Sequence, residues 1–441
     1  MGLSPMMKQY FDIKEQYKDC LLMYRLGDFY ELFFDDALTT SRELELTLTG
    51  RNCGLEERAP MCGVPFHAAN SYIAKLVAKG YKVAICEQVE DPKEAKGIVK
   101  REVVRIITPG TIDIDEATSA NDNLYLLSVY ITNKTSSIAY VDITTGEFTA
   151  LEVRDDHDNE QLISELSRIA PKEVIYFDET SSDFIERYSK AAPETYINHI
   201  DESYFKYSSC EDILKSQFEV TSLIPLDIQD KIEVTIASGA LLLYLMETEK
   251  QASPQIKHLN IKESDSGMVL DRSTMRNLEL LETQYNHSQK GSLLGVIDKT
   301  HTAMGGRLIR RFIKEPLNNS NAINKRLDAV EVLVDLPLNR ANIVASLKHV
   351  YDFERLTARI ASMRANGKDM VALKTTLHEL PAIKDELKHI DAPLLNEIFS
   401  SLDDFSSLEE LIENSIVDEP PFTITDGDLI KSGYSTELDN L

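Results

Sequence analysis

Two side chains of contrasting chemistry, an aromatic ring and a carboxylate, stand two residues apart in the stretch Gly27-Asp28-Phe29-Tyr30-Glu31. An aromatic ring that is not needed for packing can insert between stacked groups. A carboxylate beside it accepts hydrogen bonds when it is ionised and donates one when it is protonated. Phe29 and Glu31 are therefore candidates for a recognition site, which depends on the elements that present them.

The flanking sequence predicts a strand before this stretch and a helix after it. Residues 21–26 form an apolar run, and residues 32–38 show helical spacing. Gly27 permits a sharp turn, and Asp28 can cap the helix. The apolar face of this helix would consist of Tyr30, Phe33, Phe34, Ala37 and Leu38. Phe29 lies about 100° from the centre of that face, so the core does not require it.

A purely structural role for both residues is an open alternative. Asp28 and Glu31 have the spacing of a capping box, in which Glu31 would only bind a backbone N–H group. Phe29 would then cover the edge of a strand. The local pattern by itself does not decide between recognition and structure.

Four segments resemble the MutS family of DNA mismatch repair proteins, in the same order and at similar intervals as in that family's first domain. They are Tyr24-Arg25-Leu26-Gly27-Asp28-Phe29-Tyr30-Glu31-Leu32-Phe33, Met61-Cys62-Gly63-Val64-Pro65-Phe66-His67-Ala68, Val83-Ala84-Ile85-Cys86-Glu87-Gln88 and Val103-Val104-Arg105-Ile106-Ile107-Thr108-Pro109-Gly110-Thr111. The first segment resembles the mismatch-recognition motif. Weaker resemblance continues to the last residue.

The resemblance implies that the ring of Phe29 stacks on a mispaired base in kinked DNA and that Glu31 forms a hydrogen bond with that base. A mismatch weakens pairing and stacking, so kinking there costs less than in paired DNA. Ionised Glu31 would accept from a base N–H group, and protonated Glu31 would donate to a purine ring nitrogen. Arg51 aligns with a position where relatives carry a basic residue near DNA.

Further cations of the first domain are candidates for contacts with phosphates. They are Lys75, Lys79, Lys96, Lys100 and Arg101. For each of them, and for Arg51, the alternative is an ordinary solvated surface charge.

The net charge of −26 argues against a protein that coats nucleic acid non-specifically. The charge is uneven: residues 1–113 carry −2, residues 114–257 carry −16 and residues 258–441 carry −8. The middle block would repel phosphates. DNA is therefore expected to bind the first block, or the first block together with the last.

The sequence predicts a multidomain protein. Residues 1–113 are expected to form an α/β mismatch-recognition domain with a mixed sheet, and a linker is expected within residues 111–123. Residues 114–257 show a β-β-β-α-β pattern that suggests an RNase H-like α/β connector. Residues 258–428 predict an all-α core, or lever, domain of long helices punctuated by prolines. Residues 429–441 resemble the strand that enters the family's clamp domain.

Two alternative functions remain open at this stage. Asp142 ends a predicted strand before a tight turn, and Asp178 and Glu179 follow another strand. Carboxylates placed in this way would suit a metal-dependent nuclease, although the family's connector is not one and Asp142 also suits a turn. The other alternative is a MutS relative that acts on recombination intermediates. Such relatives usually lack the Phe-x-Glu pair.

No Gly-x-x-x-x-Gly-Lys-[Ser/Thr] phosphate loop occurs in the sequence. We therefore expect an N-terminal fragment of a MutS protein that catalyses nothing itself and carries no cofactor. ATP and Mg²⁺ would bind the absent ATPase domain of full-length relatives. The resemblance implies as partners mismatched or looped double-stranded DNA, a second MutS subunit in a homodimer, and a MutL-type repair factor that contacts the connector.

The five cysteines form no C-x-x-C pair, which predicts a reducing, cytoplasmic setting. The resemblance adds a bacterial, nucleoid-associated location. A metal site at Cys53 and Cys62 is a minor alternative, because no second ligand pair lies nearby in the sequence. The longest apolar run, residues 236–246, is shorter than the ~20 residues that cross a bilayer.

Overall fold

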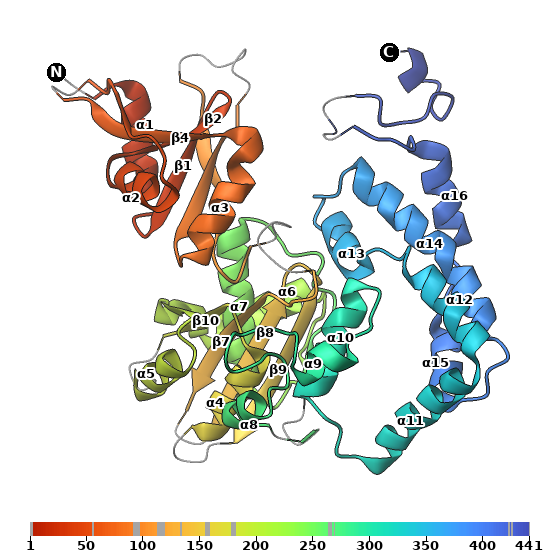
Figure 1. The fold of residues 1–441 in the computed structure, drawn as a ribbon. Coiled ribbons are helices and arrows are strands. Elements are labelled where there is room, and N and C mark those ends of the chain that lie inside the picture. Colours follow the sequence, from red (N-terminus) through yellow and green to blue (C-terminus); the bar gives the residue numbers. More distant parts are fainter. Residues whose placement is uncertain are drawn as a thin grey trace. The chain divides into compact units, whose positions relative to one another are not determined.

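The fold of the chain is taken from a computed structural model (Figure 1). It describes residues 3–54, 57–90, 98–112, 120–132, 135–154, 159–177, 182–262, 267–268, 270–421, 424 and 427–440. The chain divides into two compact units. The first consists of Met1–Ala120, Leu124–Ile143 and Glu147–Lys262, and the second of Asn121–Asn123, Thr144–Gly146 and Glu263–Leu441. The domain boundaries expected from the sequence stay predictions, and most of the expected linker lies outside the described residues.

A six-stranded sheet forms the first part of the first unit. Its strands are β1 (Cys20–Leu26), β2 (Phe29–Phe33), β3 (Thr49–Arg51), β4 (Ala59–Pro65), β5 (Lys82–Gln88) and β6 (Arg101–Ile107). Their order across the sheet is β3-β4-β2-β1-β5-β6. Strands β1 and β5 are parallel, and the other neighbours are antiparallel. The sheet is thus mixed, as the sequence predicted.

Helices cover both faces of this sheet. They are α1 (Pro5–Lys14), α2 (Phe34–Leu44) and α3 (Ala69–Ala78). Helix α1 begins with Ser4 as its cap, whose Oγ accepts from the Met7 N–H group at 3.3 Å. Side chains of α1 pack with Tyr24 and Phe33 on one face. Residues of α2 and α3 pack with Tyr30 on the other face.

The predicted helix that begins near Asp28 is wrong. Residues Phe29–Phe33 form strand β2, which pairs with β1 across a two-residue turn at Gly27 and Asp28. Gly27 has a φ of 59°, a conformation that glycine adopts at little cost. The aromatic side chains of β2 suit a pleated, half-buried surface. The helix starts only at Phe34 and runs to Leu44.

A second six-stranded sheet has the order β11-β10-β7-β8-β9-β12. Its predicted β-β-β-α-β pattern is confirmed by β7 (Tyr125–Ile131), β8 (Thr135–Asp142), β9 (Glu147–Arg154), α4 (Glu160–Ile169) and β10 (Glu173–Tyr176). Strands β7, β8 and β9 are antiparallel neighbours, and β10 lies parallel to β7. The sequence did not predict α5 (Ser182–Ala191), β11 (Tyr196–His199), α6 (Tyr207–Gln217) or β12 (Asn260–Lys262).

The long apolar run of the sequence forms a buried helix, α7 (Ile232–Glu249). It packs against the second sheet and against α6, so it is apolar on nearly all sides. A Cβ atom on Gly239 would lie 2.3 Å from the Cβ atom of Cys210, so glycine is needed for this close helix contact. Among the described residues, no helix is both long enough and apolar enough to cross a membrane.

A fully buried carboxylate, Glu173 on β10, joins the two sheets of the first unit. Its Oε2 atom accepts from the Gly110 N–H group at 3.0 Å and from the Thr108 hydroxyl, both just after β6. Its Oε1 atom accepts from the Tyr244 hydroxyl at 2.7 Å and from the Asn198 amide at 3.0 Å. Burial and then this carboxylate raise the pKa of Tyr244 well above its ordinary value, which keeps the hydroxyl a donor.

The second unit is helical, as predicted. Its helices are α8 (Arg272–Asn277), α9 (Leu293–Ile297), α10 (Ala303–Lys314), α11 (Ser320–Asp335), α12 (Pro337–Leu347), α13 (Phe353–Ala361), α14 (Gly367–Leu387), α15 (Pro393–Ser401) and α16 (Ser406–Ser415). The prolines were expected to separate the long helices, but α14 continues through Pro381. Proline removes one helical hydrogen bond. Buried Leu377 and Ile383 on either side hold the helix in place.

The strand expected at residues 429–441 is also wrong for its described part. Only Ile430 forms an isolated bridge, with Ile416. The remainder consists of turns and a short 3₁₀ helix at Leu438–Asn440.

We expect Glu173→Gln to destabilise the first unit. All four groups around the Glu173 carboxylate donate hydrogen bonds, so the amide nitrogen of glutamine would face donors and lose their bonds. The expected loss is about 2–3 kcal/mol, measured by urea denaturation. Glu152→Gln, on an exposed position of β9, is the matched control and should leave the midpoint unchanged. Equal midpoints for both variants would contradict this account of the buried network.

Candidate nucleic-acid interface

The end of the β1–β2 hairpin presents Phe29 to solvent. Phe29 lies opposite Leu26 on β1 and opposite Pro65 on β4, and the residue is 47% exposed. Successive side chains of a strand point to opposite faces. Glu31 therefore lies on the same face as Phe29, whereas Tyr30 between them points into the core. The structure thus brings Phe29 and Glu31 together at the edge of the packed region.

Gly63 leaves space between these two side chains. It lies directly opposite Glu31 on β4 and has no side chain of its own. A Cβ atom at this position would lie 3.6 Å from Glu31 Cγ and 3.9 Å from Phe29 Cδ1. Phe29 and Glu31 therefore border the same stretch of bare backbone, which a flat group could approach closely.

Arg51 reaches the same site from β3. Its Nη1 atom forms an ion pair with Glu31 Oε2, and the two side chains are 37% and 16% exposed. Glu31 is therefore not part of a capping box, because Asp28 lies in the hairpin turn and not at a helix start. Three of the predicted site residues come together at this place.

Two residues that the sequence analysis did not single out, Arg25 and Phe66, support the hairpin end from the opposite face. The Arg25 guanidinium carbon lies 3.6 Å from the centre of the Phe66 ring, and Arg25 Nε donates to the Gly27 carbonyl at 2.5 Å. The Phe66 N–H group donates to the Asp28 carbonyl at 2.8 Å. Their signal in the sequence was a basic residue within the motif and an aromatic residue directly after Pro65.

The buried hydroxyl of Tyr30 completes this supporting face. It donates to Glu87 of β5, and burial together with that carboxylate raises the pKa of Tyr30 above its ordinary value. Tyr30 therefore stays protonated. The hairpin that carries Phe29 is thus tied through side chains to β5, which lies beyond β1 in the sheet.

Lys75 does not lie in this group of side chains. It is exposed on α3, 5.7 Å above the Tyr72 ring, and α3 packs on the face opposite to Phe29 and Glu31. Its contact with DNA stays a separate prediction.

Of the other candidate cations, two form ion pairs and one is buried. Lys79 pairs with Glu43 at 3.0 Å and Lys100 pairs with Glu102. Lys96 lies outside the described residues. The expectation for Arg101 is wrong, because this residue is buried and donates to the Arg25 carbonyl at 2.8 Å.

The position of Asp142 does not support the predicted nuclease site. Asp142 is fully buried at the end of β8, and its Oδ2 atom accepts from the Leu124 N–H group at 3.1 Å. Asp178 and Glu179 lie outside the described residues. In the part of the chain that the structure describes, no three His, Cys, Asp or Glu side chains are grouped as metal ligands.

The cysteine thiols are all free and buried. Burial raises the pKa of Cys62 to about 11 and the pKa values of Cys20, Cys86 and Cys210 to about 12. Protonated thiols bind metals poorly.

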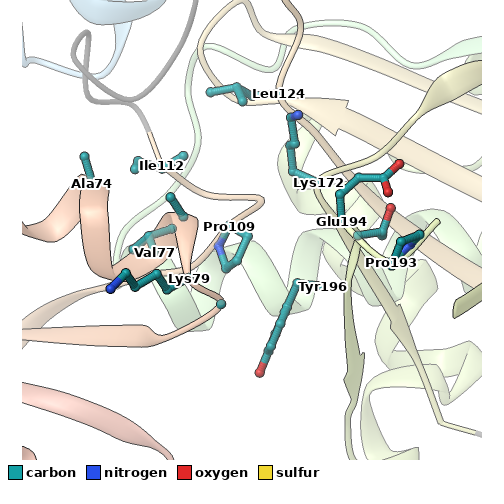
Figure 2. A pocket seen from close by; sticks show the side chains of 13 residues that line it. Ala74, Val77, Lys79, Pro109, Ile112, Leu124, Lys172, Pro193, Glu194 and Tyr196 are labelled. Atoms are coloured by element: carbon teal, nitrogen blue, oxygen red, sulfur yellow. The ribbon is translucent and has the colours of Figure 1, made fainter. Parts of the chain in front are cut away.

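A cavity of about 490 Å³ lies between the two sheets of the first unit. Figure 2 shows that residues of α3 and Pro109 line one side, and that Lys172 and Tyr196 line the other. None of Phe29, Glu31 and Arg51 lines it, so it is separate from the hairpin site.

Three family models match the chain: MutS domain I over residues 4–116, MutS domain II over residues 124–260 and MutS domain III over residues 273–439. Together they span most of its length. The chain belongs to the MutS family. The resemblance inferred from the four sequence segments is thereby confirmed.

Proteins named DNA mismatch repair protein MutS are similar to this chain along its whole length. The chain is 49% identical over 443 residues to the DNA mismatch repair protein MutS of Alkaliphilus oremlandii and 49% identical over 440 residues to that of Ruminiclostridium cellulolyticum. Identity to the Clostridioides difficile protein is 46% over 439 residues. Each match covers 100% of this chain but only 50%, 50% and 46% of the relative. The chain therefore spans about half the length of these relatives.

We expect Arg25→Ala to loosen the end of the hairpin. The substitution removes the guanidinium stacked on Phe66 and its bond to the Gly27 carbonyl, at a cost of about 1–2 kcal/mol. Urea denaturation measures this loss. Arg42→Ala removes an exposed guanidinium from α2 and serves as the control, with little change expected. A larger effect of Arg42→Ala than of Arg25→Ala would contradict the supporting role.

Proposed function

We propose that this MutS-family chain recognises mismatched double-stranded DNA, with Phe29 stacking on the mispaired base and Glu31 forming a hydrogen bond with it. One observation carries the proposal: an exposed aromatic ring and a carboxylate lie on the same face at the end of a supported hairpin. The names of the similar proteins, which are DNA mismatch repair proteins, support the same class of ligand.

The cost of unstacking DNA explains how a ring at this position could detect a base step that deforms easily. An apolar side chain that inserts between base steps must unstack them, which costs a few kcal/mol. The cost is lower where pairing is already poor. The strand pairing on both sides of β2 keeps the backbone of Phe29 in place, so little ordering of the backbone is required on binding.

The carboxylate of Glu31 is suited to discriminate mismatched from matched DNA and not to increase the affinity for DNA in general. Phosphates repel Glu31 on any duplex, so it adds to binding only where a base offers it a hydrogen bond. In a matched pair the Watson–Crick N–H groups already have partners. The near-neutral charge of residues 1–113, against −16 for residues 114–257, supports DNA binding at the first sheet.

The metal-dependent nuclease is not favoured, because the carboxylate of Asp142 is buried and bonded to backbone. We also do not favour a relative that acts on recombination intermediates, because the Phe-x-Glu pair is present and Phe29 is exposed.

We further propose the finer properties that the resemblance implies. An RNase H-like connector is supported by the three antiparallel strands followed by parallel β10 and β11. Residues 1–441 catalyse nothing by this proposal, and ATP and Mg²⁺ bind the remaining half of full-length relatives. A second MutS subunit and a MutL-type factor at the connector are the proposed protein partners, in the bacterial cytoplasm near the nucleoid.

We expect Phe29→Ala to remove the preference for mismatched DNA. Fluorescence anisotropy would compare a matched duplex with duplexes that carry a G·T mispair or an unpaired T, at two salt concentrations. Loss of one stacking contact should weaken mismatch binding by roughly 10- to 100-fold, and matched binding much less. The control is Phe405→Ala, an exposed phenylalanine of the second unit, which should keep the preference.

Two outcomes would overturn the proposal. Weak, equally salt-sensitive binding of the parent chain to all duplexes would mean that residues 1–441 do not discriminate. Cleavage of the DNA that is abolished by Asp142→Asn would favour the nuclease instead.

A further inference from the structure

The side chain of Arg51 points toward a carboxylate, although a cation that contacts phosphates would be expected to extend into solvent. Its Nη1 atom pairs with Oε2 of Glu31. Within the ranges that the structure describes, no hydrogen bond to Oε1 of Glu31 is found. One oxygen of the carboxylate is thus held, and the other remains available beside Phe29.

We propose that Arg51 is a positioning residue for Glu31, which sets the discrimination between mismatched and matched DNA and does not act mainly as a phosphate contact. This inference rests on the proposed function and deepens it. Arg51 holds Oε2 and thereby orients Oε1 to accept from a base N–H group. The ion pair is made by the ionised carboxylate, which accepts and cannot donate.

The strands that carry the two partners of the ion pair, β2 and β3, both pair with β4. Glu31 on β2 is paired opposite Gly63 of β4, and Arg51 on β3 is paired opposite Ala59 of the same strand. The two side chains therefore meet across β4. Gly63 and Ala59 are small, and Met61 lies between them on the same face of β4.

Burial supports the paired state when DNA is bound. The Glu31 side chain is only 16% exposed, so its charge is less screened than that of a surface carboxylate. If Arg51 left to contact a phosphate, an unpaired carboxylate would remain beside a polyanion. A guanidinium that stays on Glu31 avoids this repulsion and limits the rotamers of the carboxylate.

A double-mutant cycle tests this proposal, with Arg51→Ala, Glu31→Gln and the double variant bound to matched and G·T duplexes. We expect Arg51→Ala to lower the ratio of mismatched to matched affinity by roughly threefold to tenfold, because an unheld carboxylate forms a weaker bond to the base. In the Glu31→Gln background it should change the ratio no further. The slope of affinity against salt should stay the same.

Arg51→Lys is the second variant, and it distinguishes a loss of positioning from a loss of folding. It keeps the charge and the β3 position, so it should restore part of the discrimination that Arg51→Ala loses. Urea denaturation of each variant shows whether the sheet is intact.

A phosphate contact would give the opposite pattern. Arg51→Ala would then weaken both duplexes equally, would do so in the Glu31→Gln background as well, and would reduce the salt slope by about one. That result overturns the positioning role.

If Phe29→Ala abolishes the preference while Arg51→Ala leaves it unchanged, only this inference fails. If the parent chain shows no preference, the proposed function fails and this inference fails with it.

Discussion

The alternation of side chains along β2 is the constraint on which the candidate site depends. The two-residue turn at Gly27 and Asp28 sets the register of β2 against β1, so odd-numbered Phe29 and Glu31 share one face while Tyr30 enters the core. A shift of one residue would bury the carboxylate and expose the tyrosine. Recognition chemistry and core packing are therefore specified by the same register.

Buried or half-buried polar contacts hold the surroundings of this hairpin. Arg51 pairs with Glu31 on the exposed face, and Arg25 lies on Phe66 on the other face. Deeper in the same unit, Glu173 accepts four hydrogen bonds from groups of both sheets. Such contacts specify geometry more than they add stability, because each charge or dipole is costly to leave unpaired. A rigid hairpin suits a residue that must insert into a duplex.

Much of the architecture could be predicted from local pattern. The β-β-β-α-β order of the second sheet and the helical character of the second unit were both predicted. The errors fell where local pattern was ambiguous. Residues 29–33 carry apolar side chains at both helical and strand spacing, and pairing with β4 decided for the strand. The helix through Pro381 continues because buried leucine and isoleucine neighbours compensate for one lost hydrogen bond.

The sequence by itself determined the family, the chemical pair Phe29 and Glu31, and their place after a turn, because residue types and short spacings are local properties. Only the tertiary structure decided that the two share a strand face and that Arg51 joins them. The ion pair links residues 20 positions apart through an intervening strand, β4. Local spacing carries no information about such contacts, since they follow from strand order. It was likewise the arrangement of the helices that separated Lys75 from this group.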